Sequence, residues 1–252
     1  MAPFATIYTT NTFTHARLLK TLAAASLNSL SLVIDPTFNY PTTNKEPDFL
    51  SKFPHGKIPA LETPSGFCLA ESTAMAQYVA ESGPKKDQLM GRTPEERALI
   101  AMWICFSDQT LLADSSPVLV FALGRAEWNI TIPSRIEQFT RGLNRLEMHL
   151  QQPGRMWLVG DVEGEEGLSM ADLSVAGALY WNFKFWLDGE ERAKYPGVMG
   201  WWERVMEVKG VGEAFGAPVE MCKVRPDLRS PEEKEKDKAE KGESAGDGEV
   251  KK

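Results

Sequence analysis

The clearest candidate binding residues lie between Lys52 and Glu81, in the stretch KFPHGKIPALETPSGFCLAESTAMAQYVAE. Pro59 cannot donate a hydrogen bond to a neighbouring strand, so it belongs at the first residue of a strand or on an edge strand. Ile58 precedes this proline and is therefore biased toward an extended conformation. Its N–H and C=O stay available to an extended ligand backbone. The pattern predicts a peptide-binding edge at Ile58 and Pro59.

A second binding feature follows at the start of a helix. Glu71 and Ser72 open an apolar-periodic segment, where unpaired N–H groups and the helix dipole favour an anion such as a carboxylate. Lys57 could pair with another carboxylate of the same ligand. Alternatively, Lys57 is a solvated turn residue and Ser72 an ordinary N-cap. Their joint spacing with Pro59 favours a binding site.

The elements that must position these residues can be predicted from the apolar pattern. We expect a strand over residues 5–9, a helix starting near Thr14, and a second strand over 30–34 that is parallel to the first. A short helix over 48–51 and two strands near 60–62 and 67–69 should follow, the strands joined by a turn at 64–66. A helix over 73–81 closes this order, which is that of a thioredoxin-like sheet.

The rest of the chain is predicted to be helical. Residues 83–87 are polar and contain Gly and Pro, and Thr93 is placed to cap the next helix, with Pro94 in its first turn. A further helix is expected over 133–150. Ser169 and Asp172 have the spacing of a capping box, which signals folding and has no catalytic role.

Several of these motifs resemble the glutathione transferase superfamily, and within it the transferase-like domain of the elongation factor 1B gamma subunit and its fungal relatives. The resemblance runs from about residue 4 to 223. Its motifs are FPHGKIPAL (53–61), GFC (66–68), ESTAM (71–75), WICFSD (103–108), VFALG (120–124) and PVEMC (218–222).

This resemblance implies an α/β plus all-α fold. Residues 1–83 would form a thioredoxin-like glutathione-binding domain, 84–93 a linker, 94–223 an all-helical domain, and 224–252 a charged tail. It implies glutathione as co-substrate and a homodimer. The residues that it places around glutathione are His55, Lys57, Ile58, Pro59, Glu71 and Ser72; in the family the proline is cis.

The resemblance does not identify the group that activates the glutathione thiol. Family members use a Tyr, Ser or Cys near the end of the first strand or the start of the first helix. Here that loop offers Thr10, Asn11 and Thr12, and the usual serine position, four residues before a helix arginine such as Arg17, is Phe13. The three polar residues are candidates, although all of them are also common in turns. Tyr8 lies within the strand and could face either way.

The electrophile pocket would be lined by the first helix and the long helices of the second domain. Trp103, Phe106, Ser107 and Thr110, with Phe121 as a further candidate, could face it, although an aromatic stripe at helical spacing is more often core. Asp108 lies within an apolar helix, where an unpaired carboxylate is costly. It could serve a dimer interface or the glutathione amine, or lie at the surface.

Two functions remain open. The first is a freestanding glutathione transferase that adds the thiolate to a hydrophobic electrophile. In fungal secondary-metabolite pathways such reversible addition can also isomerise a conjugated double bond. The alternative is a non-catalytic elongation factor 1B gamma-like interaction subunit. The missing Tyr, Ser or Cys donor favours the alternative, and the end of the chain at Lys252 without a further domain counts against it.

Composition excludes several other classes. The chain has 252 residues, of which 42% are hydrophobic and 25% charged, and a net charge of −7. These values are ordinary for a soluble globular protein and argue against general nucleic-acid binding. The three cysteines form no metal-type spacing with the histidines, so no metal site is expected, and Cys105 is expected in the core. No secretory or membrane-spanning segment is evident, which favours the cytoplasm. From Ser230 onward few apolar residues occur, so disorder is expected.

Overall fold

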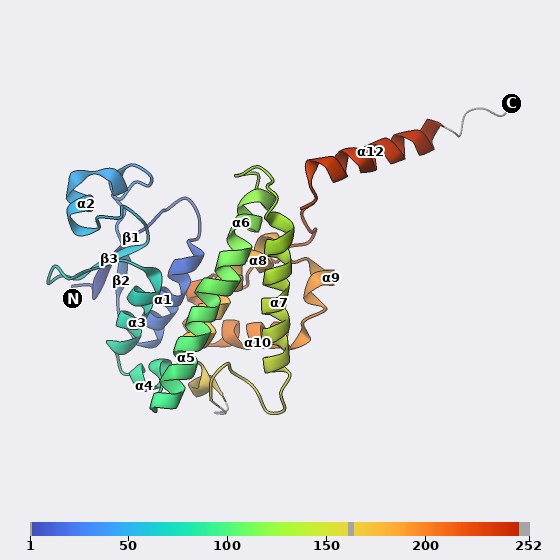
Figure 1. The fold of residues 1–252 in the computed structure, drawn as a ribbon. Helices are drawn as coiled ribbons and strands as arrows, with labels where there is room; N and C mark the ends of the chain where they lie inside the picture. Colours follow the sequence, from blue (N-terminus) through green and yellow to red (C-terminus); the bar gives the residue numbers. More distant parts are fainter. Residues whose placement is uncertain (1, 161–163, 247–252) are drawn as a thin grey trace.

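The structure is a computed structural model that describes residues 2–160 and 164–246. The N-terminal domain contains a four-stranded sheet, and a helical domain follows it in the chain (Figure 1). This confirms the predicted fold class, a thioredoxin-like domain followed by an all-helical one. The predicted linker contains a short helix, α4 (Lys86–Met90).

The sheet has the strand order β2-β1-β3-β4. Its strands are β1 (Ala5–Tyr8), β2 (Leu32–Ile34), β3 (Ala60–Glu62) and β4 (Cys68–Leu69). The first two strands are parallel, as predicted, because a helix connects them; β1 with β3 and β3 with β4 are antiparallel.

Three helices complete this domain: α1 (Ala16–Leu27), α2 (Pro47–Lys52) and α3 (Ser72–Glu81). Alternation along β1 sends Ala5 and Ile7, both fully buried, into the main core with α1 and α3. Tyr8 packs instead with a smaller cluster of Phe38, Phe49 and Phe53, on the side of α2. The start of α1 is two residues later than predicted, so Thr14 belongs to the preceding loop.

The second domain is built from helices. The long ones are α5 (Pro94–Phe106), α6 (Ala113–Ala122), α7 (Ile132–Leu150), α8 (Met170–Phe185) and α10 (Pro196–Glu207), and the short ones are α9 (Gly189–Arg192) and α11 (Val211–Phe215). A π-helical segment, η2 (Ser107–Leu112), joins α5 to α6. None of the described helices is both long and apolar enough to cross a membrane.

The N-cap of α5 and the position of Cys105 within this helix can be compared with their predictions. The Thr93 side chain accepts a hydrogen bond from the Glu96 N–H, which confirms the predicted cap. The core position predicted for Cys105 is wrong, because this residue is exposed. Its neighbours Ile104 and Phe106 are buried, and a helix turns successive side chains by about 100°, so one residue in an apolar run can face solvent.

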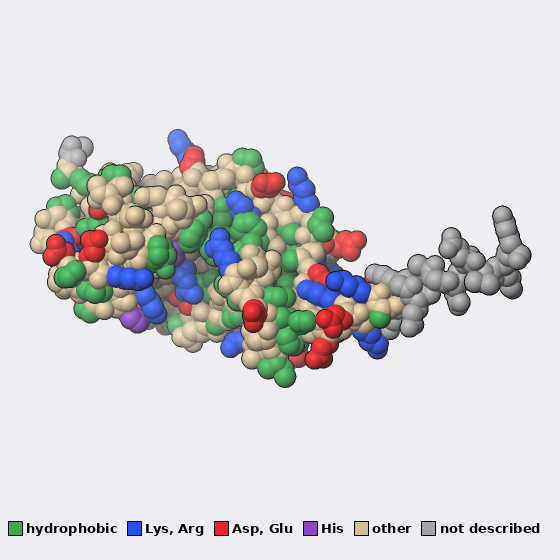
Figure 2. Space-filling view, turned by 90° about the horizontal axis from the view of Figure 1, so that it is seen from above, with side chains coloured by type: hydrophobic (Ala, Val, Ile, Leu, Met, Phe, Trp, Pro, Cys, Tyr) green, Lys and Arg blue, Asp and Glu red, His purple; other side chains and the backbone are tan. Residues whose placement is uncertain are grey.

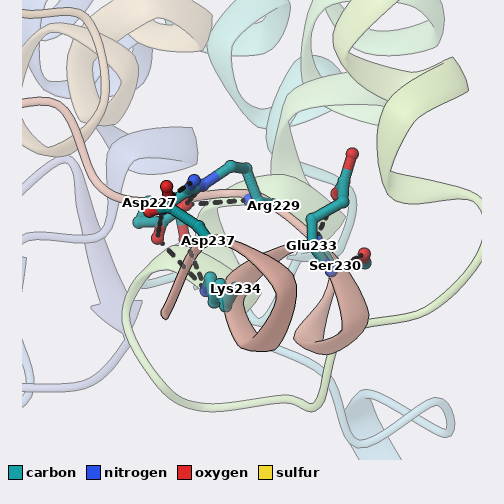
Figure 3. A network of polar contacts seen from close by, with 6 residues as sticks. All are labelled: Asp227, Arg229, Ser230, Glu233, Lys234 and Asp237. Carbon is teal, nitrogen blue, oxygen red and sulfur yellow. Dashed lines mark hydrogen bonds and ion pairs between the residues drawn. The ribbon is translucent and has the colours of Figure 1, made fainter. Parts of the chain in front are cut away.

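The charged tail also differs from its prediction. Residues 231–246 form α12 (Pro231–Gly246), which projects away from the helical domain (Figure 1); the last six residues lie outside the described part. A capping box starts this helix, because the Ser230 N–H donates to Glu233 Oε2 at 2.7 Å and the Glu233 N–H donates to Ser230 Oγ at 3.1 Å (Figure 3). Arg229 and Lys234 both contact Asp227 beside it. The S-x-x-E spacing of Ser230 and Glu233 is the local sequence signal for this helix start.

The predicted capping box at Ser169 and Asp172 is confirmed and lies at the centre of the helical domain. Asp172 is fully buried and accepts hydrogen bonds from the Ser169 N–H and hydroxyl, the Leu158 N–H and the Trp201 indole N–H, at 2.9–3.0 Å. Burial raises the pKa of Asp172, and these hydrogen bonds oppose the rise. One carboxylate therefore ties α8 to α10 and to the segment before α8.

We expect Asp172→Ala to lower the free energy of unfolding by roughly 3–5 kcal/mol, because it leaves several buried donors without an acceptor. Asp172→Asn retains one acceptor oxygen and should cost less. Urea denaturation followed by circular dichroism measures both values. A loss below about 1 kcal/mol for Asp172→Ala would contradict this role.

Candidate functional site

A cavity of about 370 Å³ lies between the loop that precedes β3 and the start of α3. All six residues predicted to contact glutathione line it: His55, Lys57, Ile58, Pro59, Glu71 and Ser72. The same cavity is also lined by Arg17, Lys52 and Cys68, which the sequence-based prediction did not include. Its volume is within the range of about 300–1,000 Å³ that is usual for small-molecule sites.

One wall of the cavity is the segment before β3, which includes Ile58 and Pro59. The Ile58–Pro59 peptide bond is cis. The pairing of β3 with β1 begins at Ala60, opposite Tyr8. The Ile58 backbone therefore lies just before the paired part of the strand, at the position expected for a peptide-binding edge.

The opposite wall is the first turn of α3. Ser72 is the first residue of this helix and is 8% exposed. Glu71, its N-cap, has φ 66° and ψ 112°, a backbone conformation that is unfavourable for a non-glycine residue and persists only where the surroundings hold it. The helix N-terminus faces the cavity with its N–H groups and its positive dipole end, which suits a carboxylate.

Basic side chains form part of the cavity lining. Arg17, in the first turn of α1, and Lys52, at the end of α2, join Lys57 and His55 in its lining. Seen from above, lysine, arginine and histidine side chains are visible on the N-terminal domain, at the left of Figure 2. Such a lining suits a ligand with more than one carboxylate. Arg17 could have been found from its position near the start of the predicted first helix.

Lys52 is partly neutralised by a neighbour. Its ammonium contacts both carboxylate oxygens of Glu62 at 2.8 Å, and Lys52 together with Tyr8 lowers the pKa of Glu62. Burial, and next the Glu62 charge, raises the pKa of the Cys68 thiol. Cys68 therefore stays a neutral thiol in the cavity wall.

The Tyr8 hydroxyl is not placed to donate to the glutathione thiol. Its hydroxyl donates to Glu62 Oε2 at 2.7 Å. Burial raises the pKa of Tyr8, and the hydrogen bond to Glu62 raises it further. The phenol proton is thus donated to a carboxylate of the same domain and is not available to a thiolate.

The three residues predicted to activate the thiol lie in the loop between β1 and α1. Thr10 is buried, and its hydroxyl oxygen lies 2.8 Å from that of Thr12 and accepts the Thr12 N–H. Asn11 and Thr12 are exposed. Continuing the pairing of β1 with β3 would bring this loop next to Pro59, but none of the three lines the cavity.

The four residues predicted to line the electrophile pocket lie elsewhere. Trp103 and Phe106 are buried and contact each other edge to face, with the Arg145 guanidinium over both rings. Ser107 is fully buried and donates to the Ile104 carbonyl, and Thr110 lies close to Gly142 of α7. These helix–helix contacts argue against direct contact with a ligand in the cavity.

Other aromatic side chains do lie where the two domains meet. Phe13, in the loop before α1, is 37% exposed and packs against Trp181 of α8 at 5.7 Å, with the Arg125 guanidinium at the same distance from its ring. His15 stacks on Phe13. Burial, reinforced by Arg17, lowers the pKa of His15 to about 4, so its imidazole is neutral near pH 7.

Comparison with known proteins is consistent with this geometry. Residues 11–81 match the glutathione S-transferase N-terminal domain, and residues 131–208 match the C-terminal domain. The chain is 39% identical over 219 residues to the glutathione S-transferase-like protein LUC7 of Fusarium sp, covering 86% of this chain and 95% of that protein. It is 41% identical, with the same coverage, to the glutathione S-transferase-like protein FUS3 of Gibberella moniliformis.

A more distant relative is elongation factor 1-gamma of Rattus norvegicus, at 33% identity over 73% of this chain and 40% of that protein. Among solved structures, the transferase-like domain of elongation factor 1-gamma from Saccharomyces cerevisiae superposes with a TM-score of 0.73 at 20% identity, covering 91% of this chain and 100% of that one. A glutathione S-transferase-I bound with lactoylglutathione gives 0.70 at 25% identity, covering 85% and 99%. This chain therefore belongs to the glutathione S-transferase family.

Proposed function

We propose that this protein is a glutathione transferase that binds glutathione in the cavity beside α3. The observation that carries the proposal is the convergence in one cavity of a helix N-terminus, the backbone segment before β3 and four basic side chains. Ser72 and the first turn of α3 would hold the γ-glutamyl carboxylate. Ile58 would pair with the peptide backbone, and Lys57 would contact the glycine carboxylate. The glutathione-derived ligands named for the solved relatives support the same ligand class.

The proposed reaction needs little covalent chemistry from the protein. A free thiol has a pKa of about 8.5, and lowering it by two units takes about 2.7 kcal/mol. Hydrogen-bond donors and a helix N-terminus can supply this. The thiol proton passes to solvent, the thiolate sulfur forms a bond to an electrophilic carbon, and the displaced electron pair leaves with the leaving group or enters a conjugated system.

We extend the proposal to a hydrophobic electrophile, such as a conjugated intermediate of secondary metabolism, and to action in the cytoplasm. When the sulfur adds to a conjugated carbon–carbon double bond, that bond becomes a single bond. Rotation about it can then occur before the thiol leaves again. Conjugation and cis–trans isomerisation would then be two outcomes at one site. The exposed ring of Phe13 beside Trp181 provides an apolar surface near the loop where the thiol is expected.

A second candidate function is that of a non-catalytic interaction subunit. The similarity to elongation factor 1-gamma favours it, as does the position of Thr10, Asn11 and Thr12 outside the lining of the cavity. The two candidates differ in a simple property. A transferase must bind glutathione, whereas an interaction subunit has no need to.

Wild-type protein should bind glutathione, and Ser72→Ala should weaken binding. Loss of one hydrogen bond to a carboxylate costs about 1.5–3 kcal/mol, or roughly tenfold to a hundredfold in Kd. Isothermal titration calorimetry measures both. Ser134→Ala is a matched control, because Ser134 is an exposed serine in the first turn of α7. Absence of binding to the wild type would remove the transferase proposal.

The thiol donor can be identified from pH profiles of kcat/KM with an enone substrate. If Asn11 donates to the sulfur, Asn11→Ala should raise the pKa of bound glutathione by about one unit, which lowers the thiolate fraction about tenfold below that pKa. The profile then moves to higher pH. Thr10→Val and Thr12→Val test the other candidates, and Tyr8→Phe should leave the profile in place. If all three candidate variants match the wild type, this loop does not supply the donor.

We further propose that the protein forms a homodimer. Phe67, Leu99 and Met102 are large apolar side chains with 39–47% exposure, and such exposure is reduced when copies associate. Analytical ultracentrifugation should give twice the mass of the chain. A monomer over the micromolar range would contradict the proposal, and Met102→Asp should shift a true dimer toward monomer if this face is the interface.

A further inference from the structure

Three polar side chains form a cluster that joins the two domains behind the first turn of α3. The Lys20 ammonium, on α1, donates to Thr73 Oγ1 at 2.6 Å and to Asp108 Oδ1 at 3.3 Å. The Thr73 hydroxyl donates to Asp108 Oδ2 at 2.5 Å. Thr73 belongs to the first turn of α3, and Asp108 to the π-helical segment η2 of the helical domain. Each of the three therefore contacts the other two.

Lys20 is unusually buried for a lysine. It is 2% exposed, and lysine is almost never buried to this degree without a partner. Burial lowers the pKa of Lys20, and the charge of Asp108 and its hydrogen bond oppose this. Asp108 itself retains 27% side-chain exposure. The Asp108 carboxylate is therefore not unpaired, because it contacts a cation of its own chain.

A buried ion pair is weak evidence for stability, because apolar residues of similar volume often serve as well. What such a pair does provide is a fixed geometry. Here the pair holds the side chain of Thr73, two residues after Glu71. The positive φ of Glu71 must be held by its surroundings. The π-helical turn is also a feature that occurs often at functional sites.

None of the three residues lines the cavity, yet Thr73 directly follows Ser72, which does. The cluster thus reaches the glutathione site through the backbone of α3, and Lys20 also shares α1 with Arg17, which lines the cavity. We propose that Lys20 is a positioning residue. With Asp108, it holds Thr73 against the helical domain and so keeps Glu71 and Ser72 in the orientation that accepts the γ-glutamyl carboxylate. The inference rests on the proposed glutathione binding.

The test removes both charges while nearly preserving shape, with the double variant Lys20→Met/Asp108→Asn. We expect glutathione affinity to fall about twofold to thirtyfold, the range for residues that act on a site without touching its ligand. Hydrogen exchange of the amides of residues 72–75 in the ligand-free protein should become faster. Calorimetry and exchange mass spectrometry measure the two effects. Unchanged exchange in this turn would overturn the inference.

A matched control removes a different ion pair. Arg135 and Asp114 are 2.8 Å apart and connect α7 to α6, so Arg135→Met/Asp114→Asn makes the same chemical change away from α3. Glutathione affinity should stay as in the wild type. An equal loss in the control would show that the effect is general destabilisation, and would overturn the positioning role.

Two further comparisons separate positioning from folding. Thr73→Val removes the hydroxyl and should weaken binding, whereas Thr73→Ser keeps the hydroxyl and should retain it. In a Ser72→Ala background, the Lys20→Met/Asp108→Asn change should lower glutathione affinity little further. The Ser72 hydroxyl that Lys20 helps to position is absent there. Full additivity would overturn the inference.

The failure of the inference and that of the proposed function give different results. A wild-type protein without glutathione affinity would remove both. A wild-type protein that binds glutathione, together with charge variants that bind it equally well, would remove only the role of Lys20.

Discussion

The close approach of α1 to its neighbours is the constraint on which the rest of the structure depends. This helix contacts α3 within its own domain and α8 and α11 in the helical domain. Its buried face is made largely of alanines, including Ala23, Ala24 and Ala25, which are at most 3% exposed. A Cβ at Gly177 of α8 would lie 3.4 Å from the Ala16 carbonyl oxygen, in ordinary van der Waals contact, so α8 packs directly against the start of α1. Larger side chains would separate the two domains.

The geometry of the candidate site depends on the packing of α1. The same helix presents Arg17 to the cavity and Lys20 to Thr73, and the loop before it brings Phe13 to Trp181. The cavity lies within the N-terminal domain, but α1 and α3, which contribute to its walls, pack against α8 of the helical domain. Groups held on packed helices keep their positions more closely than groups on free loops.

The fold and the residues that line the cavity could be predicted from the sequence because both depend on local signals. The apolar pattern of the strands, the Thr93 cap and the Ser169–Asp172 box all act within a few residues. What the sequence could not predict depends on long-range packing. The Lys20–Asp108 pair spans 88 positions, and no local rule indicates which face of a helix Cys105 or Trp103 occupies. The tail helix is a different case, since its capping signal at Ser230 was local and was outweighed by composition.

The backbone conformation at Glu71 places stability and ligand recognition in conflict. Glycine would adopt a φ of 66° without the steric cost that a side chain incurs there. It would also remove a carboxylate from the cavity wall and loosen the turn that opens α3. Selection for thermal tolerance alone would thus favour glycine at this position, whereas selection for ligand recognition would retain a side chain. Among engineered or diverged forms of this protein, the residue found at position 71 would indicate which of the two pressures had prevailed.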